Sequence, residues 1–107
     1  MDLISKLSDF ELLVKTKNLV LEEKRITQEV LSHLEEIEYR KLYLEKGFSS
    51  LFEYCVHELK YSEGSANRRI SAMRVIKKIP EAKEKLAQGA VNLSTLTQLH
   101  GFLRKNG

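Results

Sequence analysis

The side chains with the clearest potential for chemistry are polar and basic ones within a single segment, residues 62–78. Several of them recur at intervals of four, three and four residues, which places them on one face of a helix. They are Asn67, Ser71, Arg74 and Lys78, with Arg68 beside them. Asparagine, serine, arginine and lysine can bond to the base edges and phosphate oxygens of nucleic acids. The segment therefore predicts a DNA-binding helix.

A different face of the same segment is apolar, and its helical spacing predicts a buried stripe. The members of this stripe are Ala66, Ile70, Met73 and Ile76. Ser62 can cap the helix, and Lys60 and Tyr61 form a short connection from a smaller helix before it. Two helices joined by a tight turn, with the contacts on the second, are typical of a helix-turn-helix.

We assign contacts by position along this helix, with base edges near its N-terminal part and phosphates near its end. Base edges are assigned to Asn67, Arg68 and Ser71, and phosphates to Arg74, Lys77 and Lys78. At the helix start, Lys60 and Ser62 could bind a phosphate together with the free backbone amides. The complete predicted DNA-binding set is Lys60, Ser62, Ser65, Asn67, Arg68, Ser71, Arg74, Lys77 and Lys78.

The alternative is that this basic face is an ordinary solvated surface. A salt-bridged exposed helix would alternate the signs of its charges, yet Glu63 is the single acidic residue of the segment. Arg69 could instead pair with acidic residues of the preceding helices. We therefore favour a nucleic-acid contact over a solvated face.

Charge is divided unevenly along the chain. Residues 1–59 hold eight Lys and Arg against twelve Asp and Glu, a net charge of −4. Residues 60–107 hold ten against three, a net charge of +7, so the whole chain carries +3. A basic half beside an acidic half favours a polyanion, here double-stranded DNA, as the partner of one surface.

The N-terminal third predicts a long helix. Ser8 and Glu11 form a capping box, and from there to Glu45 the chain has neither Gly nor Pro. A continuous helix over this stretch would be about 50 Å long, whereas a compact domain of this size has a radius of gyration of only about 13 Å. The helix therefore either breaks near residues 16–18 into a hairpin that packs on its own domain, or projects and finds a partner.

A homodimer is the economical solution for a projecting helix, because it buries the stripe that runs along this stretch in steps of three and four residues. That stripe is apolar except for two threonines and a glutamate. The predicted dimer interface is Leu13, Val20, Thr27, Val30, Leu34 and Ile37.

The rest of the chain predicts short helices, and no strand pattern is present. Further helices are expected over residues 51–59, 81–88 and 93–103, with Gly47, Ser49 or Ser50, Pro80, Gly89 and Asn92 or Ser94 at their boundaries. We expect an all-α fold in a single domain, residues 1–107, with a long helix or helical hairpin over residues 9–45. A helix-turn-helix-like bundle is expected over residues 49–107.

Nothing in the sequence supplies a nucleophile with its base, a metal cluster or a phosphate-cradling loop. Cys55 is the single cysteine and lies in an apolar-rich segment, so we expect a buried and inert thiol. The histidines His33, His57 and His100 are dispersed over three predicted helices. We expect no catalysis by this chain, no cofactor, no metal and no small-molecule substrate.

The acidic cluster Glu35, Glu36 and Glu38 could bind a cation, but Arg40 and Lys41 follow it, and a salt-bridged surface is the better interpretation. No apolar run reaches the roughly 18 residues that a membrane span needs. The N-terminus also lacks the apolar core of a signal peptide. We expect a cytoplasmic protein without a membrane partner.

Five parts of the chain, in this order, resemble the N-terminal region of a bacterial family of HNH endonuclease-like proteins. They are residues 7–13, 40–55, 61–70, 80–81 and 89–94. The resemblance implies an all-helical, DNA-associating module that an HNH nuclease domain normally follows, and this chain stops where that domain would begin. It differs in one more respect, because Lys60 stands where a helix-turn-helix often has Gly, at a cost of about 1–2 kcal/mol.

Two hypotheses follow from the residues and the resemblance. The first is a DNA-binding helical module, the N-terminal part or a shortened paralogue of an HNH endonuclease-like protein. The alternative is a protein-interaction or dimerisation module that regulates a related nuclease. Steep weakening of DNA binding by salt would separate them, since it accompanies phosphate contacts and not the pairing of apolar helices.

Overall fold

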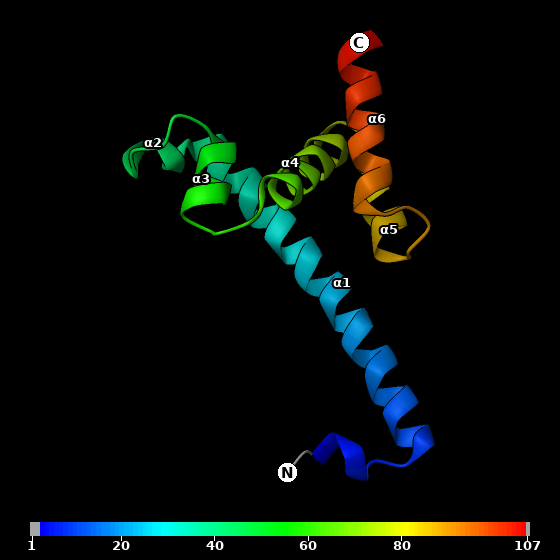
Figure 1. Ribbon diagram of the computed structural model, residues 1–107. Coiled ribbons are helices and arrows are strands. Elements are labelled where there is room, and N and C mark those ends of the chain that lie inside the picture. Colours follow the sequence, from blue (N-terminus) through cyan, green and yellow to red (C-terminus); the bar gives the residue numbers. More distant parts are fainter. Residues whose placement is uncertain (1–2, 107) are drawn as a thin grey trace.

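The N-terminal third of the chain forms one uninterrupted helix, α1 (Asp9–Arg40), in the computed structural model, which describes residues 3–106 (Figure 1). All other elements are also helical, and residues 3–106 contain no strand, as the all-α prediction requires. They are η1 (Leu3–Lys6, a 3-10 helix), α2 (Leu42–Glu45), α3 (Leu51–His57), α4 (Glu63–Lys78), α5 (Glu81–Ala87) and α6 (Leu93–Asn106).

The capping box at the start of α1 is formed. The Ser8 hydroxyl accepts a hydrogen bond from the Glu11 amide at 3.1 Å, and the Glu11 carboxylate accepts one from the Ser8 amide at 3.0 Å. The helix does not break near residues 16–18, so the hairpin alternative is wrong. The 32 residues of α1 span about 48 Å at about 1.5 Å per residue, which matches the 50 Å long axis of the molecule.

The chain leaves α1 at Lys41, which has the left-handed φ of 54° and separates α1 from the single turn of α2. The expected helix over residues 9–45 is therefore two helices. Gly47 then ends α2 with a φ of 88°. The amide of Gly47 bonds to the carbonyl of Leu44, and that of Phe48 to the carbonyl of Tyr43, both at 3.0 Å, which is a Schellman motif.

The connection from α3 to α4 has the geometry that its sequence requires. Lys60 adopts a left-handed φ of 66°, and the Tyr61 amide bonds back to the Cys55 carbonyl at 3.1 Å. Ser50 caps α3 and Ser62 caps α4, each through a hydroxyl that accepts an amide hydrogen bond at 3.1 Å. The prediction that Lys60 occupies the strained turn position is confirmed.

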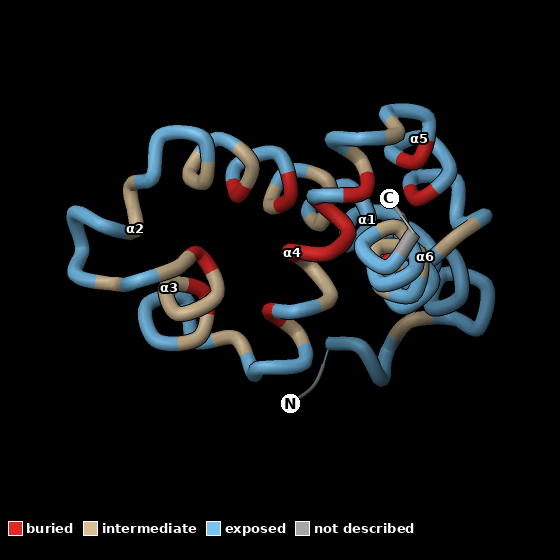
Figure 2. Tube along the Cα trace, turned by 90° about the horizontal axis from the view of Figure 1, so that it is seen from above, coloured by how far each residue is buried: buried red, intermediate tan, exposed pale blue. Residues whose placement is uncertain are grey.

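The helix α4 is the centre of the bundle, because α1, α3, α5 and α6 all pack against it. The tube in Figure 2 shows buried residues gathered along α4 and on the sides of its neighbours. The predicted apolar stripe is confirmed, since Ala66, Ile70 and Met73 are each at most 5% exposed and Ile76 packs against the core. The most extensive interhelical contact joins α4 and α6.

The second half of α1 packs into the protein's own core. Leu34 is 2% exposed, and Val30 and Ile37 pack against the core cluster, with Thr27 half-buried. The prediction that Leu34 belongs to a dimer interface is therefore wrong, because the bundle of the same chain encloses it, and Val30 and Ile37 already give part of their surface to the same core. The two remaining members of that set, Leu13 and Val20, are exposed.

The last helix, α6, is capped by the Asn92 carboxamide, which accepts a hydrogen bond from the Thr95 amide at 2.8 Å. Leu96 of α6 is fully buried, whereas Phe102 near the C-terminal end of the same helix is exposed. No helix among residues 3–106 combines the length and the apolar character that crossing a bilayer requires.

Candidate nucleic-acid interface

Because four helices surround α4, only a narrow strip of this helix faces solvent. The exposed residues of α4 are Glu63, Gly64, Asn67, Arg74, Lys77 and Lys78. At its C-terminal end the strip lies between Glu38 of α1 and the last turns of α6. A broad free face, as a helix inserted into a major groove would need, is therefore not present on α4.

The predicted contact between Ser71 and a base edge is wrong, because the Ser71 residue is only 4% exposed. Ser71 lies four residues after Asn67 and three before Arg74, so all three would share one solvent face if α4 were an isolated helix. In the bundle, the neighbours of α4 cover most of its circumference, and the small Ser71 side chain lies inside.

A basic hollow opens where α4 and α6 end near α1. Its volume is about 380 Å³, and its lining residues are Glu38, Arg74, Lys77, Lys78, His100, Leu103 and Arg104. Four of these side chains are permanently cationic and one is acidic, so the hollow carries an excess of positive charge. We call this site the basic hollow.

Within the basic hollow, Arg74 is held by an ion pair with Glu38 of α1. The Arg74 guanidinium donates to the Glu38 carboxylate at 2.6 Å, and the Glu38 side chain is 21% exposed. This pairing of Arg74 with an acidic residue of another helix was not predicted from the sequence. Since the pair neutralises Arg74, the net positive charge of the hollow comes from Lys77, Lys78 and Arg104.

His100 and Arg104 are functional candidates that sequence reasoning missed. Burial lowers the pKa of His100 below its usual value, and the positive charges of Arg74, Arg104 and Lys78 lower it further. The imidazole is therefore predominantly neutral at pH 7, and an anion in the hollow would favour its charged form. The spacing of four residues places His100 and Arg104 on one side of α6, but nothing local indicates that α4 lies beside them.

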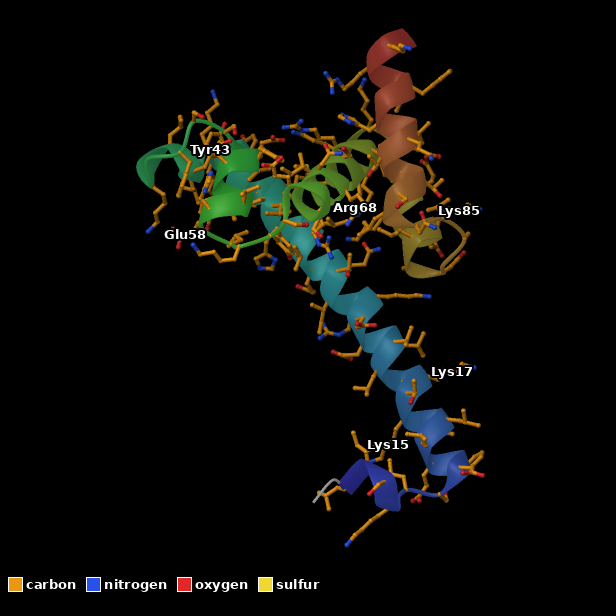
Figure 3. All side chains as sticks on the ribbon, in the orientation of Figure 1. Lys15, Lys17, Tyr43, Glu58, Arg68 and Lys85 are labelled. Carbon is orange, nitrogen blue, oxygen red and sulfur yellow. The ribbon has the colours of Figure 1, made fainter. Side chains whose placement is uncertain are left out.

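The other predicted DNA contacts lie at the N-terminal end of α4, where some of their polar groups already bond within the protein. Arg68, labelled in Figure 3, is half-buried and donates to the Ser65 hydroxyl at 3.3 Å. Its guanidinium folds back over Gly64, where an added Cβ would lie 3.2 Å from Nη1. Lys60 and Ser62 are exposed at the same end, although the Ser62 oxygen already accepts the capping hydrogen bond.

Arg69 does not pair with an acidic residue, which was the alternative considered for it. Its guanidinium lies over the Tyr61 ring at 4.8 Å from the ring centre and donates to the Ser65 carbonyl at 3.2 Å. This cation–π contact ties the start of α4 to the connection that precedes it. Arg69 is therefore a structural residue of the turn.

The remaining reactive side chains have structural roles. Cys55 is fully buried, and burial raises the pKa of its thiol to about 11, which keeps it protonated and unreactive, as predicted. His57 stacks on Phe48 and lies 3.0 Å from the Glu53 carboxylate, so it has the partner that the sequence did not indicate. Residues 3–106 present no group of three potential metal ligands.

The acidic cluster on α1 behaves as the salt-bridged surface that was expected. The Glu36 carboxylate accepts a hydrogen bond from Arg40 at 2.7 Å, and Glu38 pairs with Arg74.

Searches against family models, curated proteins and solved structures found no match to this chain.

Proposed function

We propose that this protein is a DNA-binding helical module that holds duplex DNA through phosphate contacts in the basic hollow. One observation carries the proposal: Lys77 and Lys78 of α4 and Arg104 of α6 converge around a single concave site. Side chains from two helices that meet in this way can grip adjacent phosphates, whereas cations scattered over a surface only raise the local potential.

The arrangement favours backbone contacts over extensive reading of bases. Phosphate contacts position a protein on DNA and supply salt-dependent affinity, and base-edge contacts supply sequence preference. Since α4 is enclosed by its neighbours, its capacity for base contacts is limited to Asn67 on the exposed strip and to Lys60 and Arg68 at its start. We expect modest sequence preference and a strong dependence on salt.

The resemblance to the N-terminal region of HNH endonuclease-like proteins supports the same function. In such a protein, a module of this kind would hold the duplex beside a nuclease domain.

The test is a fluorescence-anisotropy titration of a mixed-sequence duplex at salt concentrations between about 50 and 300 mM. The test variant replaces Lys77, Lys78 and Arg104 by alanine, and all three are exposed, so the fold should survive. Each phosphate contact contributes about 0.9 to the slope of log affinity against log salt. The variant should lose roughly a hundredfold or more in affinity at about 0.1 M salt and about 2.7 of the slope.

A matched control removes three exposed lysines outside the hollow, Lys6, Lys17 and Lys46. The control variant has the same net charge as the test variant, so a general electrostatic effect would weaken both equally. We expect the control to bind within about threefold of the wild type. Salt screens the attraction between DNA and lysines that do not contact it. Equal losses in the two variants would overturn the assignment of the hollow.

A further inference from the structure

Most of the first half of α1 projects from the bundle, and its last turns, near residues 20–25, lie beside α5 and the loop that follows it. Figure 1 shows this part, residues 9–26, running away from the other α-helices toward η1, and we call it the shaft. All of its residues are exposed, including many apolar ones. The exposed apolar residues of the shaft are Phe10, Leu12, Leu13, Val14, Leu19, Val20, Leu21 and Ile26.

An isolated helix of this kind is not stable by its own propensity. The 18 residues of the shaft are close to the length at which even alanine-rich helices are marginal in water, and most helical stability in proteins comes from packing an apolar face. The shaft also contains Val14, Thr16, Asn18 and Val20, which are weaker helix formers than Ala, Leu or Lys. The shaft therefore needs a partner surface that packs on its apolar residues to stabilise the helix.

One stripe of the shaft has the symmetry that pairing with itself requires. Leu12 and Ile26 lie seven residues before and after Leu19, so the three side chains follow one line along the helix. Leu19 is 67% exposed and Ile26 is 48% exposed. In an antiparallel pair with its two-fold axis at Leu19, Leu19 meets Leu19 and each Leu12 meets the Ile26 of the other copy.

The charges beside this stripe follow the same symmetry. Lys15 lies four residues before Leu19 and Glu22 three residues after it, both on the same side of the stripe. In the antiparallel pair, the Lys15 of each copy comes beside the Glu22 of the other. In a parallel pair the two-fold axis runs along the helices, so the Lys15 of one copy and the Glu22 of the other lie on opposite sides of the contact and do not pair.

The shaft as a whole is also neutral, since it holds four acidic and four basic residues. Two copies therefore approach without net repulsion. Glu22 uses a single oxygen, Oε1, for its two hydrogen bonds with Arg25 at 2.6 and 3.0 Å, and its other oxygen can accept a bond from a lysine of a second copy. Figure 3 shows Lys15 and Lys17 on opposite sides of the shaft, so Lys17 lies away from the stripe.

We infer that the shaft is the docking surface for a second copy of this chain, in an antiparallel pair centred on Leu19. The contact is made by the stripe Leu12, Leu19 and Ile26 and is oriented by Lys15 and Glu22. It replaces the interface expected from the sequence, whose members Leu34 and Ile37 pack inside the bundle. The pairing does not depend on DNA binding by the basic hollow.

The first experiment measures the mass of the full chain by sedimentation equilibrium between about 1 and 100 µM. A dimer is expected, and replacing Leu19 by glutamate should raise its dissociation constant at least tenfold. The control is Val14→Glu, which adds the same charge to an exposed position of the shaft off the stripe and should leave the dimer unchanged. A monomeric wild type, or equal effects of the two variants, overturns the inference.

The second experiment tests the orientation by disulfide cross-linking of variants that each gain one cysteine on the shaft. The native Cys55 is fully buried and will not compete. A one-to-one mixture of Leu12→Cys and Ile26→Cys should cross-link at least tenfold faster than either variant alone, because position 12 meets position 26 of the other copy. Faster cross-linking of each variant with itself would indicate a parallel pair and overturn the proposed geometry.

A charge reversal gives an independent check on the same geometry. Lys15→Glu would bring two carboxylates together at each end of an antiparallel pair and should raise the dissociation constant several-fold at low salt. In a parallel pair Lys15 does not face a charged residue at the same position of the other copy, and the dissociation constant would stay constant. Circular dichroism of each variant will confirm that the bundle remains folded.

Discussion

Replacing Glu38 by glutamine examines the basic hollow with the smallest change, because the side chain keeps its shape and loses only its charge. Glu38 bonds to Arg74 at 2.6 Å and is the one carboxylate among the residues that line the hollow. Its negative charge should stabilise the fold through Arg74 and oppose the approach of a phosphate. We therefore expect the substitution to change stability and DNA affinity in opposite directions.

The loss of stability is expected to be small. Exposed ion pairs contribute about 0–1 kcal/mol, and the Glu38 side chain is 21% exposed while that of Arg74 is 44% exposed. The partial burial of Glu38 places the loss near the upper end, at about 1 kcal/mol. For a domain of this size, such a loss lowers the melting temperature by about 4 °C.

The gain in affinity follows from the release of Arg74. A guanidinium freed from Glu38 adds one phosphate contact, which steepens the salt slope by about 0.9 and raises the affinity about eightfold at about 0.1 M salt. The assay is the anisotropy titration of a mixed duplex at several salt concentrations, with the melting temperature measured on the same sample.

The matched control is Glu36→Gln on the same helix. Glu36 bonds to Arg40 at 2.7 Å, in a pair that is more exposed and does not line the hollow. This variant should lose no more stability than Glu38→Gln and should bind DNA within about twofold of the wild type. If Glu38→Gln binds DNA no more tightly than the wild type, or with the same salt slope, the reasoning is refuted.

Three further predictions concern pH, packing and backbone strain. A bound phosphate should raise the lowered pKa of His100, so DNA affinity should increase as the pH falls from about 7.5 to 6, at most about tenfold per pH unit. Without DNA, stability should fall over the same change, because the unfolded chain binds this proton more readily. His100→Asn should flatten the affinity profile, and an unchanged profile would show that another group titrates. Leu96→Ala should cost about 2–5 kcal/mol in urea unfolding because Leu96 is fully buried. The exposed Leu44, replaced by alanine, should cost less than about 0.5 kcal/mol, and similar costs for the two would contradict the packing described. Lys60→Gly should stabilise the fold by about 0.5–1 kcal/mol, since relief of about 1–2 kcal/mol at φ 66° exceeds the added entropy of the unfolded chain. A loss of stability in this variant would show that the lysine side chain contributes more than its backbone costs.

The sequence by itself determined most of the local structure. The capping residues Ser8 and Ser62, the left-handed turn at Lys60 and the end of α2 at Gly47 all depend on groups within a few residues of one another. The buried stripe of α4 was also predictable, because a helix that packs on one neighbour shows its apolar residues at a spacing of three and four. These features make the all-α fold readable from the sequence.

Tertiary structure decided which helical faces remain free. The spacing pattern assigned a solvent face to Ser71, but a helix surrounded by four others buries small polar residues as well as apolar ones. In the same way, the apolar stripe of α1 is continuous in sequence, yet the bundle covers Leu34 and leaves Leu13 exposed. Helical periodicity cannot distinguish these cases, because it reports a residue's angle on its own helix and not the position of other helices.

The candidate site depends even more on packing between distant segments. Lys77 and Lys78 were predictable as a basic group at the end of one helix, since neighbouring cationic residues are visible in the sequence. The ion pair of Arg74 with Glu38, 36 residues away, and the approach of His100 and Arg104 to the end of α4 were not. Interactions over such separations arise only when the apolar surfaces of α1, α4 and α6 are buried together, and that burial, not local spacing, sets which charges become neighbours.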